Sequence, residues 1–182
     1  MNNGHGHKLY IAYGSNLSYS IMKYRCPDAI PLHRLMVKDA CLVFRSTADL
    51  QYEPGCYAPV GLWEISAEDE ERLDIAEGVS RGSYGKYRFK LDSGEKALVY
   101  LMHDKGIFPP SAWYVSKIRD GYRNFGLKES FLDEAVSHSW FRKEPTNETK
   151  RRRSRQKLTS HQRNLVKMPE SLAMKLVDKG RK

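Results

Sequence analysis

Cysteine is scarce in this chain, and the cysteines that occur show no pairing pattern. The 182 residues contain three, Cys26, Cys41 and Cys56, with no CxxC pair among them. Disulfide frameworks and zinc sites need even or closely spaced sets of cysteines. We therefore expect neither, and predict reduced thiols of the kind found in the cytoplasm. A catalytic cysteine stays open as an alternative, but no local motif marks one.

Long apolar runs are also missing. No stretch approaches the roughly 18 apolar residues that a membrane-spanning helix needs. Residues 1–7 are polar and lack the hydrophobic centre of a signal peptide. We expect a flexible leader over 1–7, no membrane contact and a cytoplasmic location. The nucleotide-binding strings GxxxxGKS/T and GxGxxG are absent as well, which argues against a polyphosphate ligand.

The chain carries an excess of positive charge, and this excess lies at one end of the chain. The formal net charge is +9, and residues 142–182 hold 14 of the 31 Lys and Arg residues but only 4 of the 22 Asp and Glu residues. The remaining residues therefore carry a net charge of −1. We predict one domain over 8–141 and a basic, flexible tail over 142–182, with a weak helix at 171–177.

The rest of the chain alternates strand and helix signals. Strands are expected at 8–13, 41–45 and 60–65, with a polar segment at Pro54 and Gly55 between the last two. A helix is expected over 17–24, and another from a Ser66 cap to Gly78. Alternation over 86–91 and 97–102 predicts a β-hairpin. Two further helices follow Ser111, the second with an apolar stripe at Leu132, Val136 and Trp140.

The first string that suggests chemistry is Tyr13-Gly14-Ser15-Asn16-Leu17, directly after a short buried strand. A tight turn from a strand into a helix directs several backbone N–H groups toward one point, which favours a small carboxylate. Gly14 permits close approach, and Ser15 and Asn16 add side-chain donors. The alternative is a simple turn in which Asn16 caps the next helix and no ligand binds.

The second string is Leu73-Asp74-Ile75-Ala76-Glu77-Gly78. Helical spacing places Glu77 on the same stripe as Leu73, which should face the core. An inward carboxylate must be paired or must have a raised pKa, and a raised pKa suits a general acid or base. Alternatively, Glu77 turns outward or pairs with Arg81 or Arg88. Tyr114 likewise is either a core aromatic or a hydrogen-bond donor to a ligand.

Residues 10–17, YIAYGSNL, resemble the N-terminal signature of the γ-glutamylcyclotransferase-like family, which includes the AIG2-like proteins. The LDxxEG helix end of that family is matched by residues 73–78, its GxY by 82–84, and its preceding strand by 61–65. Pro110-Ser111, Tyr114, Gly121 and Gly126-Leu127 resemble the last helix of the family. The resemblance spans residues 8 to 135 in the family's order.

The resemblance implies an α+β fold, a small mixed β-barrel surrounded by helices, here followed by a basic C-terminal extension. It implies a cavity at one mouth of the barrel, with Glu77 as the catalytic acid/base. It also implies a set of substrate-binding residues, from the first signature and the last helix. These are Tyr10, Ile11, Ala12, Tyr13, Gly14, Ser15, Asn16, Leu17 and Tyr114. It implies no cofactor and no metal.

The implied reaction is release of 5-oxoproline from a γ-glutamyl amide, through attack of the substrate's own α-amine on its γ-carbonyl. The leaving group, an amino acid, an amine or a larger capped molecule, is left open by the residues. One rival interpretation is a barrel that binds a small acidic metabolite without turnover. Another is a nucleic-acid-associated protein whose tail contacts a polyanion through Arg151, Arg152, Arg153, Arg155 and Lys157. If this second interpretation is correct, binding of the tail to DNA or RNA should weaken as the salt concentration rises.

Overall fold

Strands from both halves of the chain form one mixed sheet in the described residues. The structure is a computed structural model that describes residues 7–103, 106–141 and 165–167. Its strands are β1 (Lys8–Ala12), β2 (Ile30–Arg45), β3 (Thr47–Ile65), β4 (Tyr84–Lys90), β5 (Lys96–Met102) and β6 (Leu165–Lys167). They lie in the order β4-β5-β1-β3-β2-β6, with β1 parallel to β5 and β2 parallel to β6.

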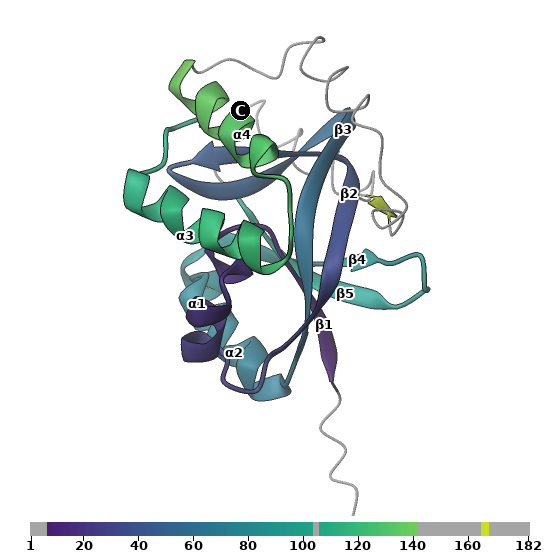
Figure 1. Cartoon of the computed structure of the whole chain (residues 1–182). Helices are drawn as coiled ribbons and strands as arrows, with labels where there is room; N and C mark the ends of the chain where they lie inside the picture. The colour runs from purple at the N-terminus through teal and green to yellow at the C-terminus, as the bar shows by residue number, and fades with distance from the viewer. Residues whose placement is uncertain (1–6, 104–105, 142–164, 168–182) are drawn as a thin grey trace, which may run out of the picture.

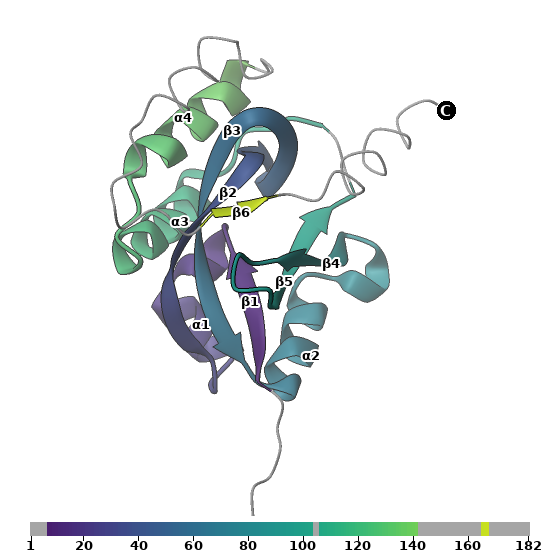
Figure 2. The ribbon, with the colours of Figure 1, turned by 90° about the vertical axis from the view of Figure 1, so that its right-hand side faces the viewer.

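The two ends of this sheet approach each other, so the sheet curls toward a barrel. Strand β6 pairs with β2 and also contacts β4, the strand at the opposite end of the order. Figure 2 shows β6, in yellow, between β2 and the β4–β5 hairpin. The predicted α+β fold is therefore confirmed. Of the predicted tail over 142–182, only β6 lies within the described residues; Arg151 to Lys157 and the helix at 171–177 lie outside them.

Four α-helices gather on one side of the sheet in the described part of the chain (Figure 1). They are α1 (Tyr19–Arg25), α2 (Ala67–Ala76), α3 (Ala112–Asn124) and α4 (Glu129–Phe141), with short 3-10 helices η1 (Ser15–Leu17) and η2 (Val79–Arg81). Helix α4 packs on β2, and α3 packs on η1. None of the helices described here is long and apolar enough to cross a bilayer.

Local capping signals behave as predicted for two helices. The Ser66 hydroxyl accepts a hydrogen bond from the Asp69 N–H at 3.1 Å, which starts α2. Gly78, just past the end of α2, has φ 64, a conformation that glycine adopts without steric cost. Ser111 caps α3 by accepting from the Tyr114 N–H at 3.2 Å. These ends depend only on neighbours in sequence, so the sequence alone predicts them.

The helix predicted over 17–24 is displaced because its proposed cap is used elsewhere. Helix α1 begins at Tyr19 after Ser18, and residues 15–17 form η1 instead. The Asn16 side chain bonds Tyr10 and Glu77 rather than capping the helix. The prediction for Trp140 is also wrong. This residue is 65% exposed, whereas Leu132 of the same predicted stripe is buried, together with Phe131 and Ala135.

The strands predicted at 41–45 and 60–65 are parts of the much longer β2 and β3. Pairing between them runs from Ile30↔Glu64 to Arg45↔Thr47. The segment with Pro54 and Gly55 interrupts the register, which passes from Lys38↔Tyr57 to Ala40↔Tyr52, but it does not separate the two strands. Opposite the extra residues of β3, Asp39 takes a positive φ of 58. Irregular pairing of this kind is a β-bulge, which local composition does not reveal.

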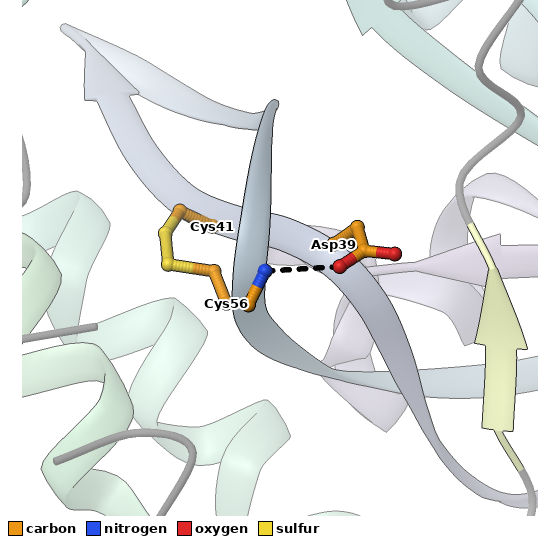
Figure 3. The surroundings of a disulfide bond; sticks show 4 residues. Asp39, Cys41 and Cys56 are labelled. Carbon is orange, nitrogen blue, oxygen red and sulfur yellow. Dashed lines mark hydrogen bonds between the residues drawn. A yellow bond between two sulfur atoms is a disulfide. The ribbon is translucent and has the colours of Figure 1, made fainter. Parts of the chain in front are cut away.

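The same irregularity brings two cysteines together. Cys41 on β2 and Cys56 on β3 form a disulfide with their Cα atoms 5.5 Å apart, and the Asp39 carboxylate accepts a hydrogen bond from the Gly55 N–H at 2.9 Å beside it (Figure 3). The expectation of three reduced thiols is therefore wrong for this pair, and Cys26 remains free and buried. An odd cysteine count does not reveal which two residues a hairpin places side by side.

Reduction of this disulfide should lower the free energy of unfolding by about 3 kcal/mol, because the bond closes a loop of 15 residues. Thermal unfolding with and without reductant measures the effect, with Cys41→Ser as the genetic equivalent. Alkylation of the denatured, unreduced protein should label Cys26 alone. Labelling of all three cysteines would contradict the pairing.

Candidate active site

A cavity of about 170 Å³ opens where β1 ends, between η1, α2 and α3. It is lined by Tyr10, Tyr13, Gly14, Ser15, Asn16, Arg25, Thr47, Ala48, Ala76, Glu77, Tyr84, Tyr100 and Tyr114. Most of the residues predicted for the site thus meet around one cavity. Three do not line it: Ile11, Ala12 and Leu17 are fully buried in the core. Both signature strings contribute to the same wall, although about sixty residues separate them.

Glycine at two positions lets the elements around this cavity approach closely. A Cβ atom at Gly14 would lie 3.2 Å from the Tyr114 hydroxyl and 3.3 Å from the Ala48 Cβ. On α3, a Cβ at Gly121 would lie 2.3 Å from the Leu17 Cβ and 2.7 Å from the Ser18 backbone nitrogen. The loop that bears Ser15 and Asn16 is therefore held directly against the backbone of α3.

Asn16 fixes the position of the Glu77 carboxylate. Its Nδ2 donates to Glu77 Oε1 at 2.9 Å and to the Tyr10 hydroxyl at 2.8 Å. Its Oδ1 accepts from Arg25 Nη1 at 2.6 Å. Because a guanidinium can only donate, this contact fixes the orientation of the amide and points its NH₂ group at Glu77. Asn16 is buried, so its rotamer is set by these three partners.

The environment of Glu77 makes it a weaker acid than an exposed glutamate. Burial raises the pKa of its carboxyl group above the ordinary 4.5, while the charge of Arg25 and the hydrogen bond from Asn16 act in the lowering direction. Glu77 is only half-buried by exposure, at the end of α2, so solvent and a ligand both reach it. The alternative partner Arg88 lies instead by Glu70, at 3.7 Å.

Near Tyr114, tyrosine side chains form part of the cavity wall. The Tyr114 hydroxyl accepts from the Ala48 N–H at 3.2 Å, and Ser15 also hydrogen-bonds it. Burial raises the pKa of Tyr114, so the group stays protonated. A hydroxyl that accepts from protein N–H groups keeps its own hydrogen for another acceptor. Tyr84 donates to the Ala48 carbonyl at 3.2 Å, and burial raises its pKa too.

Several lining residues were not predicted. Thr47, Ala48, Ala76 and Tyr100 come from elements distant in sequence from the loop, whereas Arg25 lies at the end of the next helix, α1. Tyr84 had a sequence signal, the GxY string, but no role was assigned to it. Arg25 had none, because a lysine or arginine in the last turn of a helix is common on solvent-exposed helices. Within the described residues, no group of three His, Cys, Asp or Glu side chains could hold a metal ion.

Comparison with known proteins finds relatives of this chain by sequence. A family model described as "AIG2-like family" matches residues 60–134, which include the end of β3 and all of α2, β4, β5 and α3. The chain is 27% identical over 142 residues to mouse "Gamma-glutamylcyclotransferase", covering 69% of this chain and 76% of the mouse protein.

Solved structures share the fold. One described as "Gamma-glutamyl cyclotransferase" superposes with a TM-score of 0.62 at 24% identity, over 78% of this chain and 90% of its own. A human protein described as "uncharacterized protein loc79017" gives a TM-score of 0.61 at 24% identity, over the same shares of the two chains. At this identity the structures support the fold alone.

Proposed function

We propose that this chain, which belongs to the γ-glutamylcyclotransferase-like (AIG2-like) family, is an enzyme that releases 5-oxoproline from a γ-glutamyl amide. Its similarity to the mouse protein supports cyclotransferase activity at the level of the family. The finer proposal rests on the arrangement around Glu77. Its carboxylate has a raised pKa, accepts a hydrogen bond from Asn16 and faces a cavity that the YGSN loop also lines.

Cyclisation needs a base first and an acid later. The substrate's α-ammonium must lose a proton before its nitrogen can attack the γ-carbonyl carbon and close the five-membered ring. The bond from that carbon to the leaving nitrogen then breaks. The ring nitrogen keeps one hydrogen, so two protons leave it in all, and the departing nitrogen gains both. Glu77 carries them one at a time, as base and then as acid.

The remaining residues hold the substrate in the folded shape that attack requires. Backbone N–H groups of the YGSN loop receive the α-carboxylate of the glutamyl group. The Tyr114 hydroxyl donates to the γ-carbonyl oxygen, where negative charge develops. An aligned intramolecular nucleophile can lower the barrier by several kcal/mol, up to roughly 7 to 11.

Release of 5-oxoproline from a panel of γ-glutamyl dipeptides and γ-glutamyl amines tests the proposal. We expect turnover of at least one member, without added metal or cofactor and with a free amine produced in equal amount. The rival, a barrel that binds without reacting, predicts heat of binding in calorimetry and no 5-oxoproline. Binding without product from every member would therefore replace the enzyme proposal with the rival.

A further inference from the structure

The active-site cavity contains a cation that the cyclisation chemistry does not use. Among the described residues that line it, Arg25 is the sole cation and Glu77 the sole carboxylate. No step of ring closure needs a positive side chain, because the loop N–H groups already receive the α-carboxylate. We propose that Arg25 determines specificity by pairing with a carboxylate on the leaving group of the substrate. This inference rests on the proposed function.

The contacts of Arg25 leave most of its donors for a ligand. Its guanidinium has five N–H groups, and its hydrogen bond to Asn16 Oδ1, at 2.6 Å within the described part of the chain, involves Nη1 alone. That contact holds the side chain against the cavity wall, so little further ordering is needed when an anion binds. Arginine is suited to this task because its planar fork matches the two oxygens of a carboxylate.

The position of Arg25 favours the leaving group over the glutamyl moiety. One amide, that of Asn16, connects Arg25 to Glu77, since its oxygen accepts from Arg25 and its nitrogen donates to Glu77. Glu77 protonates the departing nitrogen, so a carboxylate two bonds from that nitrogen lies within reach of the guanidinium. Arg25 comes from α1 and is half-buried, whereas the proposed function places the glutamyl moiety against the loop after β1. The charge thus lies at the solvent side, where leaving groups differ.

The preferred class is therefore a γ-glutamyl compound whose leaving amine bears a carboxylate, in preference to one whose leaving amine is neutral. A matched pair of substrates isolates this feature. γ-Glutamylalanine and γ-glutamylethylamide differ only in the carboxylate of the leaving group. The wild-type protein should show the higher kcat/KM with γ-glutamylalanine, mainly through a lower KM.

Arg25→Met keeps the length of the side chain and removes its charge, and is the variant of choice. We expect the ratio of kcat/KM for γ-glutamylalanine to that for γ-glutamylethylamide to fall by about 10- to 100-fold, the value of charge-assisted hydrogen bonds. Lys23→Met, an exposed cation on the same helix, is the matched control and should keep the wild-type ratio. Equal losses of kcat/KM for both substrates would overturn the proposal. Arg25 would then act by positioning Asn16 and Glu77, or by binding the glutamyl carboxylate.

Two further measurements separate the possible failures. Because the charge of Arg25 lowers the pKa of Glu77, the ratio is compared at the pH of maximal activity for each variant. Calorimetry of both compounds with Glu77→Gln and with Glu77→Gln/Arg25→Met measures binding without turnover. A preference for γ-glutamylalanine that disappears with Arg25 supports the carboxylate site even if no 5-oxoproline forms. If Arg25→Met releases 5-oxoproline from both substrates with the wild-type ratio of kcat/KM, the role of Arg25 is refuted but the proposed function is not.

Discussion

Replacing Glu77 by glutamine should lower kcat by roughly 10²- to 10⁴-fold, the usual share of a general acid–base group. Glutamine keeps the shape of the side chain, and its oxygen still accepts the hydrogen bond from Asn16 that is 2.9 Å long in the wild type. Only the titratable group is lost. The rate of 5-oxoproline release under saturating substrate measures the effect, and circular dichroism checks that the fold is retained.

The same substitution should leave stability at neutral pH unchanged or higher. A carboxyl group whose pKa is raised on folding favours the folded state below its unfolded pKa. That contribution is lost as the pH rises through the folded pKa, so ionised Glu77 destabilises the protein at neutral pH. A large drop in Tm for Glu77→Gln would show that the carboxylate is structural. Unchanged turnover in a folded variant would remove Glu77 from the mechanism.

The pH dependence of the wild type follows from the same shift. The base must be ionised, so kcat/KM should rise with pH through the pKa of Glu77, and the midpoint of this acid limb should lie above 4.5. The limb should be absent from the residual activity of Glu77→Gln.

Replacing Asp49 by asparagine should destabilise the protein by about 3 to 5 kcal/mol, because it leaves a buried guanidinium without its counter-ion. Asp49 Oδ2 accepts from Arg45 Nε at 2.8 Å, and Oδ1 accepts from the Met102 N–H at 3.0 Å. The two side chains are only 3% and 6% exposed. Arginine does not lose its proton at accessible pH, so the charge of Arg45 cannot be neutralised.

Asp133→Asn is the matched control. Asp133 also pairs with an arginine, Arg119, but its side chain is 58% exposed. Water screens such a pair, so its loss should cost less than about 1 kcal/mol. Chemical denaturation of both variants compares them. Similar denaturation midpoints for the two variants would show that the buried Arg45–Asp49 pair contributes no more to stability than the exposed pair. Because Asp49 follows Ala48, whose N–H holds the Tyr114 hydroxyl, the buried substitution should also reduce turnover.

The sequence predicted those features whose causes lie within a few residues. Ser66 and Ser111 cap their helices, Gly78 ends α2, and the alternation over 86–91 and 97–102 corresponds to the β4–β5 hairpin. The resemblance to one family then predicted that the YGSN loop and Glu77 share a site. These two strings do meet at the cavity.

The tertiary structure alone decided which distant residues meet. The break in register between β2 and β3 brings Cys56 beside Cys41, and the displaced start of α1 directs Asn16 between Arg25 and Glu77. Such contacts depend on long-range pairing and on which polar groups must be satisfied on burial, and no local pattern encodes either. The sequence by itself determined the fold class and the candidate catalytic carboxylate. Only the folded chain placed an arginine beside that carboxylate, because the two lie on helices separated by strands β2 and β3.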